Sequence, residues 1–174
     1  WKDGKLAIVT YGNYKTSYNY YSGVLVTQSD TSGVFQRRDT MILNAAGYVK
    51  SQGNITYEYD GEGHKVKETD GSYGIMTYEW SGGNLVKETE TGSSSTYTTT
   101  YEYFTDKKNW IPSLFYGKES TNLVKKETGS AGYTTEYQYE FDAKGNATIV
   151  RSVRKDNTGT ITYTSKSTNT FKCD

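Results

Sequence analysis

The side chains best suited to acid–base or metal chemistry are few. The chain of 174 residues has one histidine, His64, and one cysteine, Cys173. A Ser-His-Asp or Cys-His arrangement would therefore have to use His64 itself. The same scarcity excludes the ligand spacings of zinc sites. Cys173 has no partner for an internal disulfide, so the only disulfide it could form is one between two chains.

His64 closes the run Asp60-Gly61-Glu62-Gly63-His64, which is typical of a turn and lacks the ligand order of a calcium-binding EF-hand loop. Aligned runs in the same chain place Asn84 and Asn146 at this position. A histidine that asparagine replaces is better explained as an exposed turn residue than as a general base. We therefore predict no catalytic residue, no metal site and no cofactor.

Three carboxylates, Glu58, Glu79 and Glu102, recur at one position of a repeated pattern, each with a lysine nearby. A pair of carboxylates can serve as the acid and base of a glycosidase. The regular spacing instead indicates solvated cross-strand pairs with lysine. A hydrolase is therefore the least favoured of the functions considered.

The composition excludes several partners. The chain has 20 basic and 20 acidic side chains, and its basic residues form no cluster larger than a pair such as Arg37-Arg38. Nucleic acid and polybasic membrane binding are therefore not expected. No stretch approaches the ~18 apolar residues of a membrane helix, and the expected strands lack the outward apolar band of a membrane barrel.

The elements that position these residues are repeated hairpins. The unit at 57–69 contains Tyr-Glu-Tyr, an Asp-x-x-Gly turn and Val-Lys-Glu-Thr; copies follow at 78–89, from Tyr101 and from Tyr137. Alternation of tyrosine with polar residues places the tyrosines on one face of a strand. With 18 tyrosines and few aliphatic residues, the core is expected to be aromatic. A four-residue loop at 60–63 would place Tyr59 opposite His64, Glu58 opposite Lys65 and Tyr57 opposite Val66.

Extended along the chain, the pattern predicts an all-β, antiparallel up-and-down meander of about 12–14 strands in a single domain over residues 1–174. The expected strands lie near 5–11, 14–20, 24–28, 34–43, 48–51, 55–59, 65–69, 75–80, 84–90, 96–104, 123–128, 133–141, 146–154 and 160–171. An open twisted sheet usually carries fewer than ~10 strands, so a strong curl into a barrel or half-barrel is expected. Residues 1–6 align with 80–85, which predicts that a first strand, and any signal or lipid anchor, lies upstream.

A segment near 104–117 interrupts the repeat and is predicted to be a short helical or loop insertion. It contains the only proline and an apolar cluster that includes Trp110, Phe115 and Tyr116. The segment either plugs one end of a curled sheet or covers a ligand cavity as a lid. These three aromatic residues are the predicted ligand-binding residues.

Two resemblances rest on these motifs. The Tyr-x-Tyr-Asp-x-x-Gly units resemble the YD repeats of Rhs-type proteins, although Trp80-Ser81 replaces Tyr-Asp in one copy. Residues 101–109 and 117–125, set among the hairpins, resemble a Bacteroidetes family of secreted lipoproteins, a domain of unknown function with a porin-like fold. That resemblance implies an exported protein, periplasmic or at the outer membrane, with a lipid anchor upstream of Trp1. It implies no catalytic residue.

These observations favour a non-enzymatic, extracytoplasmic binding or display module with a glycan or a protein as its partner, because tyrosine and tryptophan offer rigid apolar faces with a polar tip. The alternative is a structural scaffold of the cell envelope that binds no small ligand. In that case the tyrosines serve only as core.

Overall fold

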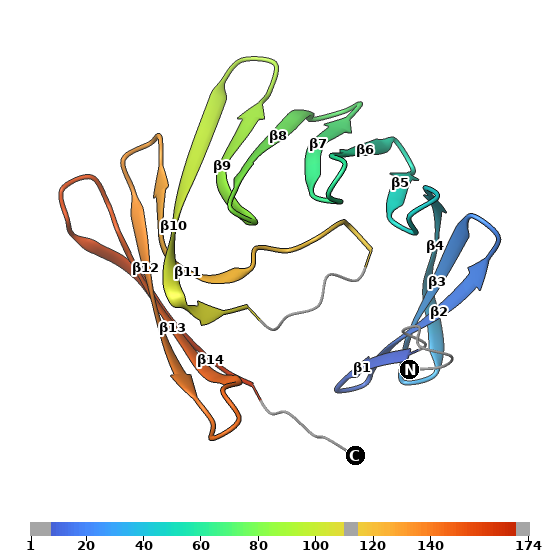
Figure 1. Ribbon diagram of the computed structural model, residues 1–174. Helices are drawn as coiled ribbons and strands as arrows, with labels where there is room; N and C mark the ends of the chain where they lie inside the picture. Colours follow the sequence, from blue (N-terminus) through green and yellow to red (C-terminus); the bar gives the residue numbers. More distant parts are fainter. Residues whose placement is uncertain (1–7, 110–114, 170–174) are drawn as a thin grey trace. The chain divides into compact units, whose positions relative to one another are not determined.

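The computed structural model describes residues 8–109 and 115–169, and they form a sheet of 14 antiparallel strands that follow one another in chain order (Figure 1). The described residues contain no helix, so none that could cross a membrane. The strands are β1 Ile8–Tyr11, β2 Tyr14–Tyr21, β3 Val24–Thr31, β4 Val34–Leu43, β5 Val49–Gln52, β6 Ile55–Tyr59, β7 Lys65–Asp70, β8 Gly74–Ser81, β9 Asn84–Thr91, β10 Thr96–Lys108, β11 Asn122–Gly129, β12 Thr134–Phe141, β13 Ala147–Lys155 and β14 Ile161–Thr168. The prediction of an all-β up-and-down meander is confirmed.

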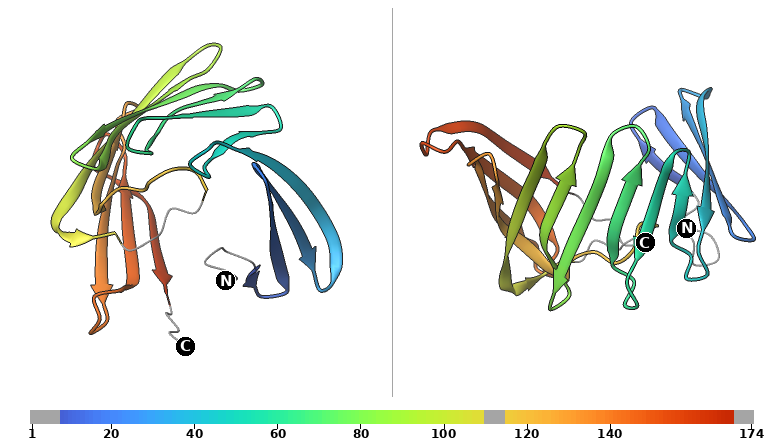
Figure 2. Two further views of the ribbon diagram at one scale, coloured as in Figure 1. Left: turned by 45° about the vertical axis from the view of Figure 1, so that its right-hand side comes forward. Right: turned by 90° about the horizontal axis from the view of Figure 1, so that it is seen from above.

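The chain divides into two compact units, which are described separately. Unit 1 comprises Trp1–Ile75 and Ser113–Lys118, and unit 2 comprises Met76–Pro112 and Glu119–Asp174. Within each unit, neighbouring strands run side by side in opposite directions (Figure 2). The prediction of one domain over residues 1–174 stays a prediction, as does the upstream strand inferred from residues 1–6, which lie outside the described residues.

The repeated Glu and Lys side chains form cross-strand ion pairs on the face opposite the tyrosines. Glu58 lies 3.1 Å from Lys67, Glu79 lies 2.7 Å from Lys87, and Glu102 lies 3.6 Å from Lys126. These glutamates are more than half exposed, so each pair stabilises the fold by less than about 1 kcal/mol. The interpretation of the recurring glutamates as solvated pairs is confirmed.

The hairpin at 60–64 differs from its predicted register. Asp60 N–H donates to the His64 carbonyl at 2.9 Å, and Gly63 has φ 95°, so the loop has three residues and ends in a left-handed glycine. A bulge at Val66 follows, and it shifts the strands by one further residue. As a result Glu58 faces Lys67 and Tyr57 faces Glu68. The predicted pairs were wrong because they omitted both the shorter loop and the bulge.

The core of unit 1 combines aliphatic and aromatic side chains, so the prediction of an aromatic core holds only for its partly buried layer. Leu25, Met41, Val49 and Tyr57 are its buried members. Partly buried side chains pack against them, namely Tyr18, Tyr20, Leu43, Ile55, Tyr59 and Phe115. Alternation along the strands therefore gives one tyrosine-rich face, here called the tyrosine face.

The interruption begins later than predicted. Strand β10 continues through Phe104 to Lys108, where Lys108 pairs with Asn122. Strand alternation continues over these residues and favours the extended conformation. The described part of the insertion consists of bends at 115–117, and the predicted helical stretch around Trp110 lies outside the described residues.

Candidate functional site

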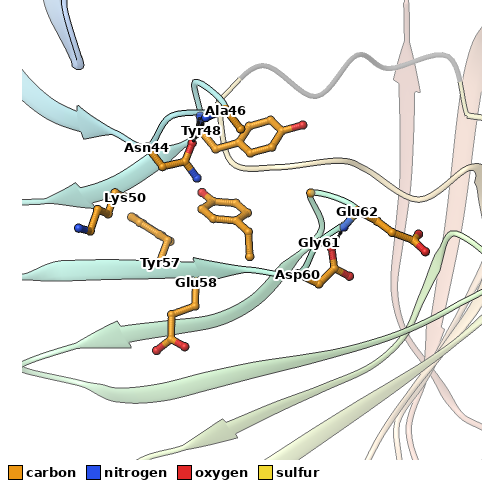
Figure 3. Close-up of a pocket in the computed structure, with 11 residues that line it drawn as sticks. Asn44, Ala46, Tyr48, Lys50, Tyr57, Glu58, Asp60, Gly61 and Glu62 are labelled. Atoms are coloured by element: carbon orange, nitrogen blue, oxygen red, sulfur yellow. Dashed lines mark hydrogen bonds between the residues drawn. The ribbon is translucent and has the colours of Figure 1, made fainter.

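A groove of about 560 Å³ lies in unit 1 where strands β5 and β6 separate (Figure 3). The two strands pair only beside their turn, at Ser51–Thr56 and Gln52–Ile55. Farther along, the Tyr59 side chain crosses the separation, and its hydroxyl donates to the Val49 carbonyl at 2.7 Å. The groove is lined by Asn44, Ala46, Tyr48, Lys50, Tyr57, Glu58, Tyr59, Asp60, Gly61, Glu62 and Gly63.

Tyrosine rings form one wall of this groove. The rings of Tyr48 and Tyr59 stack with centroids 5.2 Å apart and an interplanar angle of 30°. The Tyr48 ring also lies against Gly63, where an added methyl group would approach its Cε2 and hydroxyl to 3.0 Å. A glycine at 63 therefore allows the close approach of ring and turn as well as the positive φ.

Several polar groups at the groove are not used by the fold. Asn44 Oδ1 accepts hydrogen bonds from the backbone N–H groups of Ala46 and Tyr48, both at 3.0 Å. Its amide nitrogen, the Tyr48 hydroxyl and the Lys50 ammonium make no hydrogen bond or ion pair with the described residues. The Glu62 carboxylate, 78% exposed, lies 3.8 Å from His64 Nδ1. Donors and acceptors thus stand beside an aromatic wall.

His64 is buried, with 5% exposure, so the prediction of an exposed turn residue was wrong. Its Nδ1 lies 3.1 Å from Asp60 Oδ2, and the Asn146 amide nitrogen lies 2.9 Å from Asp142 Oδ2 in the equivalent turn. Burial raises the pKa of Asp60, but hydrogen bonds from the His64 N–H groups and Glu62 N–H outweigh it and hold that pKa below its usual value. Because asparagine makes the equivalent hydrogen bond in the other turn, the contact between His64 and Asp60 is best explained as one that stabilises the turn.

Substitutions of Asp60 and His64 should differ in how much they lower the free energy of unfolding. Asp60→Ala removes the acceptor of three hydrogen bonds and is expected to lower the free energy of unfolding by about 2 kcal/mol. His64→Asn should lower it by less than about 1 kcal/mol, because the amide can donate as Asn146 does. Urea unfolding measures both changes. Equal losses for the two variants would contradict this assignment.

The predicted ligand-binding residues have different surroundings. Phe115 packs in the core of unit 1, with its ring 5.5 Å from Tyr18 and 6.2 Å from Tyr20. Tyr116 is 36% exposed; its ring meets Tyr57 edge-on at 5.2 Å, and its hydroxyl donates to Gln52 Oε1 at 2.7 Å. Phe115 thus acts as a packing residue in unit 1, and its role in binding stays a prediction, as does that of Tyr116.

Trp110, the third predicted ligand-binding residue, lies outside the described residues, as does Cys173.

Unit 2 pairs tyrosine hydroxyls with carboxylates on its own tyrosine face. Tyr101 donates to Glu88 Oε2 at 2.6 Å, and Tyr137 donates to Glu127 Oε1 at 2.7 Å. Burial raises the pKa of both tyrosines, and the accepting carboxylates raise it further. Burial likewise raises the pKa of Tyr139 to about 12. The carboxylates of Glu88 and Glu127 accept hydrogen bonds from tyrosine hydroxyls, so their role is structural.

The fold is shared with solved structures, one of which is described here. A porin-like protein from Bacteroides uniformis superposes with a TM-score of 0.69, over 91% of this chain and 79% of that chain, at 18% sequence identity. No protein-family profile matches the chain, and no curated protein sequence matches it. The comparison therefore shows the porin-like fold alone, and the function has to be argued from the groove.

The groove residues were not predicted from the sequence. Asn44, Tyr48 and Lys50 belong to a weak copy of the repeat, in which tyrosine is expected anyway. Their importance comes from the separation of β5 from β6 and from the cross-strand Tyr59 side chain. The short strand β5 was the only available signal, since four residues cannot pair along the whole of a longer neighbour.

Proposed function

We propose that the protein is a non-enzymatic, extracytoplasmic binding module and that the groove between β5 and β6 takes a glycan. The observation that carries the proposal is that uncommitted polar groups, chiefly the Lys50 ammonium and the Asn44 amide, line the same groove as the Tyr48 ring. A protein partner that offers a polar side chain to the same groove is the other form of this proposal.

The chemistry of the groove suits a sugar. A pyranose ring presents apolar C–H faces, which pack on tyrosine, and hydroxyls, which need both donors and acceptors. Lys50 and the Asn44 amide can donate, while Glu62 can accept. The volume of about 560 Å³ is that of an ordinary small-molecule site.

Location and the finer architecture belong to the same proposal. The fold is shared with a porin-like protein of Bacteroides uniformis, which supports a place in a bacterial envelope. We propose that the chain is held there, in the periplasm or at the outer membrane, by a lipid anchor upstream of Trp1. We also propose that the sheet curls into a barrel or half-barrel, as the strand count suggests.

The test is binding to a broad glycan array, followed by groove variants. Wild-type protein should bind at least one glycan class, and Tyr48→Ala and Lys50→Ala should each weaken that binding about tenfold or more. Tyr73→Ala and Lys144→Ala are the matched controls, because these exposed side chains lie outside the groove. An array without binding, or equal effects of groove and control variants, would overturn the glycan form of the proposal.

A structural scaffold is the second candidate, and the place of Phe115 favours it. This off-pattern aromatic packs against the core tyrosines, as a purely structural role would require. If Phe115→Ala and Tyr116→Ala impair folding while the array stays blank, the scaffold function gains over binding.

A further inference from the structure

Unit 2 contains a pocket of about 320 Å³, here called the unit 2 hollow, which the proposed function does not use. It lies between the end of β10 and the turn that joins β12 to β13, and it is lined by Asp106, Lys107, Lys108, Phe141 and Gly145. These two segments lie at the same end of unit 2 (Figure 1), because β10 and β12 run in the same direction on either side of β11.

The unit 2 hollow lies at the same place in the repeat as one side of the groove in unit 1. In the turns after β6 and β12, the first residue is an aspartate whose Oδ1 accepts the backbone N–H groups of the third and fifth residues. The fourth residue of each turn is a glycine with positive φ. Phe141 thus corresponds to Tyr59 and Gly145 to Gly63, and these residues line the hollow and the groove respectively. The repeat therefore leaves a space beside an aromatic ring at this turn in each unit.

The two copies differ in how the aromatic ring is covered. In unit 1 the Tyr59 ring stacks on the Tyr48 ring, with centroids 5.2 Å apart. In unit 2 the Phe141 ring stacks on the Tyr139 ring at 6.3 Å, and the space beside Gly145 is open, since an added Cβ there would meet nothing within 4 Å. Phe141 is 37% exposed and has no polar atom in its side chain. The hollow therefore offers an apolar ring surface that a ligand can cover.

The charges that line the two sites have opposite signs. The groove in unit 1 is lined by one lysine, Lys50, and three carboxylates, whereas the unit 2 hollow is lined by two lysines and one carboxylate, Asp106. Neither Asp106 nor Lys108 forms an ion pair with the part of the chain that the structure describes. The Lys107 ammonium lies 3.9 Å from the centroid of the Phe104 ring, a contact that leaves its charge in place. With all three lining charges counted, the hollow carries one net positive charge.

The charged side chains beside the hollow do not cancel this difference. In the adjoining turn, Asp142 and Lys144 contribute one charge of each sign. Glu140, in the strand before that turn, forms an ion pair with Arg151. The groove in unit 1 stays negative even when Lys67, which pairs with one of its carboxylates, is counted. Equivalent places in the repeat are therefore suited to ligands of different charge.

The combination of a ring and two ammonium groups suits a sugar that carries a carboxylate. The C–H face of a sugar ring can pack on Phe141, and its carboxylate can accept charge-assisted hydrogen bonds from Lys107 and Lys108. The sugar hydroxyls can donate to Asp106. A volume of about 320 Å³ is at the lower end of the range for small-molecule sites. A small inorganic anion would leave the ring uncovered, and a neutral sugar would leave both ammonium groups without an anion.

We propose that the unit 2 hollow binds a carboxylate-bearing sugar, a uronic acid residue, with the sugar ring on Phe141 and the carboxylate at Lys107 and Lys108. The site shares no residue with the groove between β5 and β6. It is therefore tested separately from the proposed function, and a groove that binds no glycan leaves it unaffected.

Isothermal titration calorimetry of the full chain tests the proposal with a tetramer of galacturonic acid. The methyl-esterified tetramer is the matched neutral ligand, because it keeps the sugar rings and loses the charge. The acid should bind at least about tenfold more tightly than the ester. Lys107→Gln combined with Lys108→Gln should weaken binding of the acid about tenfold, whereas Lys125→Gln combined with Lys166→Gln, an equal loss of charge at exposed sites of unit 2 outside the hollow, should leave it unchanged.

A second variant tests the contact with the ring. Phe141→Ala should weaken binding of the acid about tenfold, since it removes the apolar surface under the sugar. Circular dichroism shows whether this variant keeps its strands. If it does not, the paired lysine variant still decides the matter, because those two side chains lie outside the core.

Four results would overturn the proposal. The first is no binding of the acid tetramer, and the second is equal binding of acid and ester. The third is an equal loss of affinity in the paired lysine variant and its control, since general attraction between charges would then explain the binding. The fourth is binding that Lys50→Ala abolishes and the paired lysine variant leaves intact, because the acid would then lie in the groove of unit 1.

Discussion

Alkaline solution should unfold this protein cooperatively above about pH 10, and its interior tyrosines should ionise only as it unfolds. Burial raises the pKa of Tyr57, Tyr59, Tyr101, Tyr137 and Tyr139, the last to about 12. A tyrosine loses a proton to become charged, so a raised pKa means that the folded state holds the proton more tightly.

The sign and size of the effect follow from proton linkage. The stabilisation is fully present below the unfolded pKa of about 10 and is lost as the pH rises through the folded pKa. Each such tyrosine can remove up to about 1.4 kcal/mol of stability per pH unit in that window. Partial solvent screening reduces this value, and five tyrosines together still remove several kcal/mol per unit. A domain of ordinary stability, about 5–15 kcal/mol, should not remain folded beyond pH ~12.

Circular dichroism and tyrosinate absorbance, followed together against pH, measure this transition. Most of the absorbance rise from the interior tyrosines should coincide with the loss of strand signal. Tyr101→Phe should move the alkaline midpoint upward, because it removes one linked proton, whereas Tyr73→Phe at an 81% exposed site should not. Titration of all 18 tyrosines near pH 10 with the strand signal intact would contradict a tyrosine core.

Gly117→Ala should lower the free energy of unfolding by about 2–4 kcal/mol. Gly117 has φ 90°, and an added Cβ would lie 2.8 Å from the Gly63 carbonyl oxygen and 2.8 Å from the Tyr59 ring. Backbone groups on both sides of Gly117 also form hydrogen bonds that hold this segment in place. Val49 N–H donates to the Phe115 carbonyl and Lys118 N–H donates to the Gly63 carbonyl, both at 2.8 Å. In the Gly117→Ala variant, residues 115–118 should therefore move away from the turn at Gly63.

Gly145→Ala is the matched control. Gly145 has φ 84°, but an added Cβ there meets nothing within 4 Å, so only the cost of the positive φ, about 1–2 kcal/mol, applies. Urea unfolding gives both values, and hydrogen exchange at Val49 reports the docking of Phe115. Equal losses for the two variants would show that the contact of Gly117 with Tyr59 and Gly63 contributes nothing.

The strands were largely predictable because the repeat encodes them locally. Alternating Tyr-x-Tyr and the Asp/Asn-x-x-Gly turns mark strand and turn without reference to the rest of the chain. The pairing of Glu58, Glu79 and Glu102 with lysines followed from alternation alone. The register at 60–64 did not, because a left-handed glycine and a bulge each shift the strands by one residue.

The candidate site was less predictable, since it depends on packing between distant residues. Phe115 was predicted to bind a ligand because it departs from the repeat, and its packing beside Tyr18 and Tyr20 in unit 1 could not be predicted from the sequence. His64 was predicted to be exposed, but its hydrogen bond with Asp60 keeps the imidazole buried. The groove arises where β5 stops pairing with β6, and Tyr48 and Lys50 carry no mark in the sequence that separates them from other repeat residues.

The glycan groove is tested most directly by nuclear magnetic resonance of the protein titrated with the strongest glycan from the array. Backbone and side-chain amide signals of Asn44, Tyr48, Lys50 and Glu62 should shift first and saturate together. Signals around Phe115 in the core, and those of the exposed Tyr73 outside the groove, should stay in place. Saturable shifts confined to other parts of unit 1 or to unit 2, with the groove signals unmoved, would contradict the assignment of this groove as the binding site.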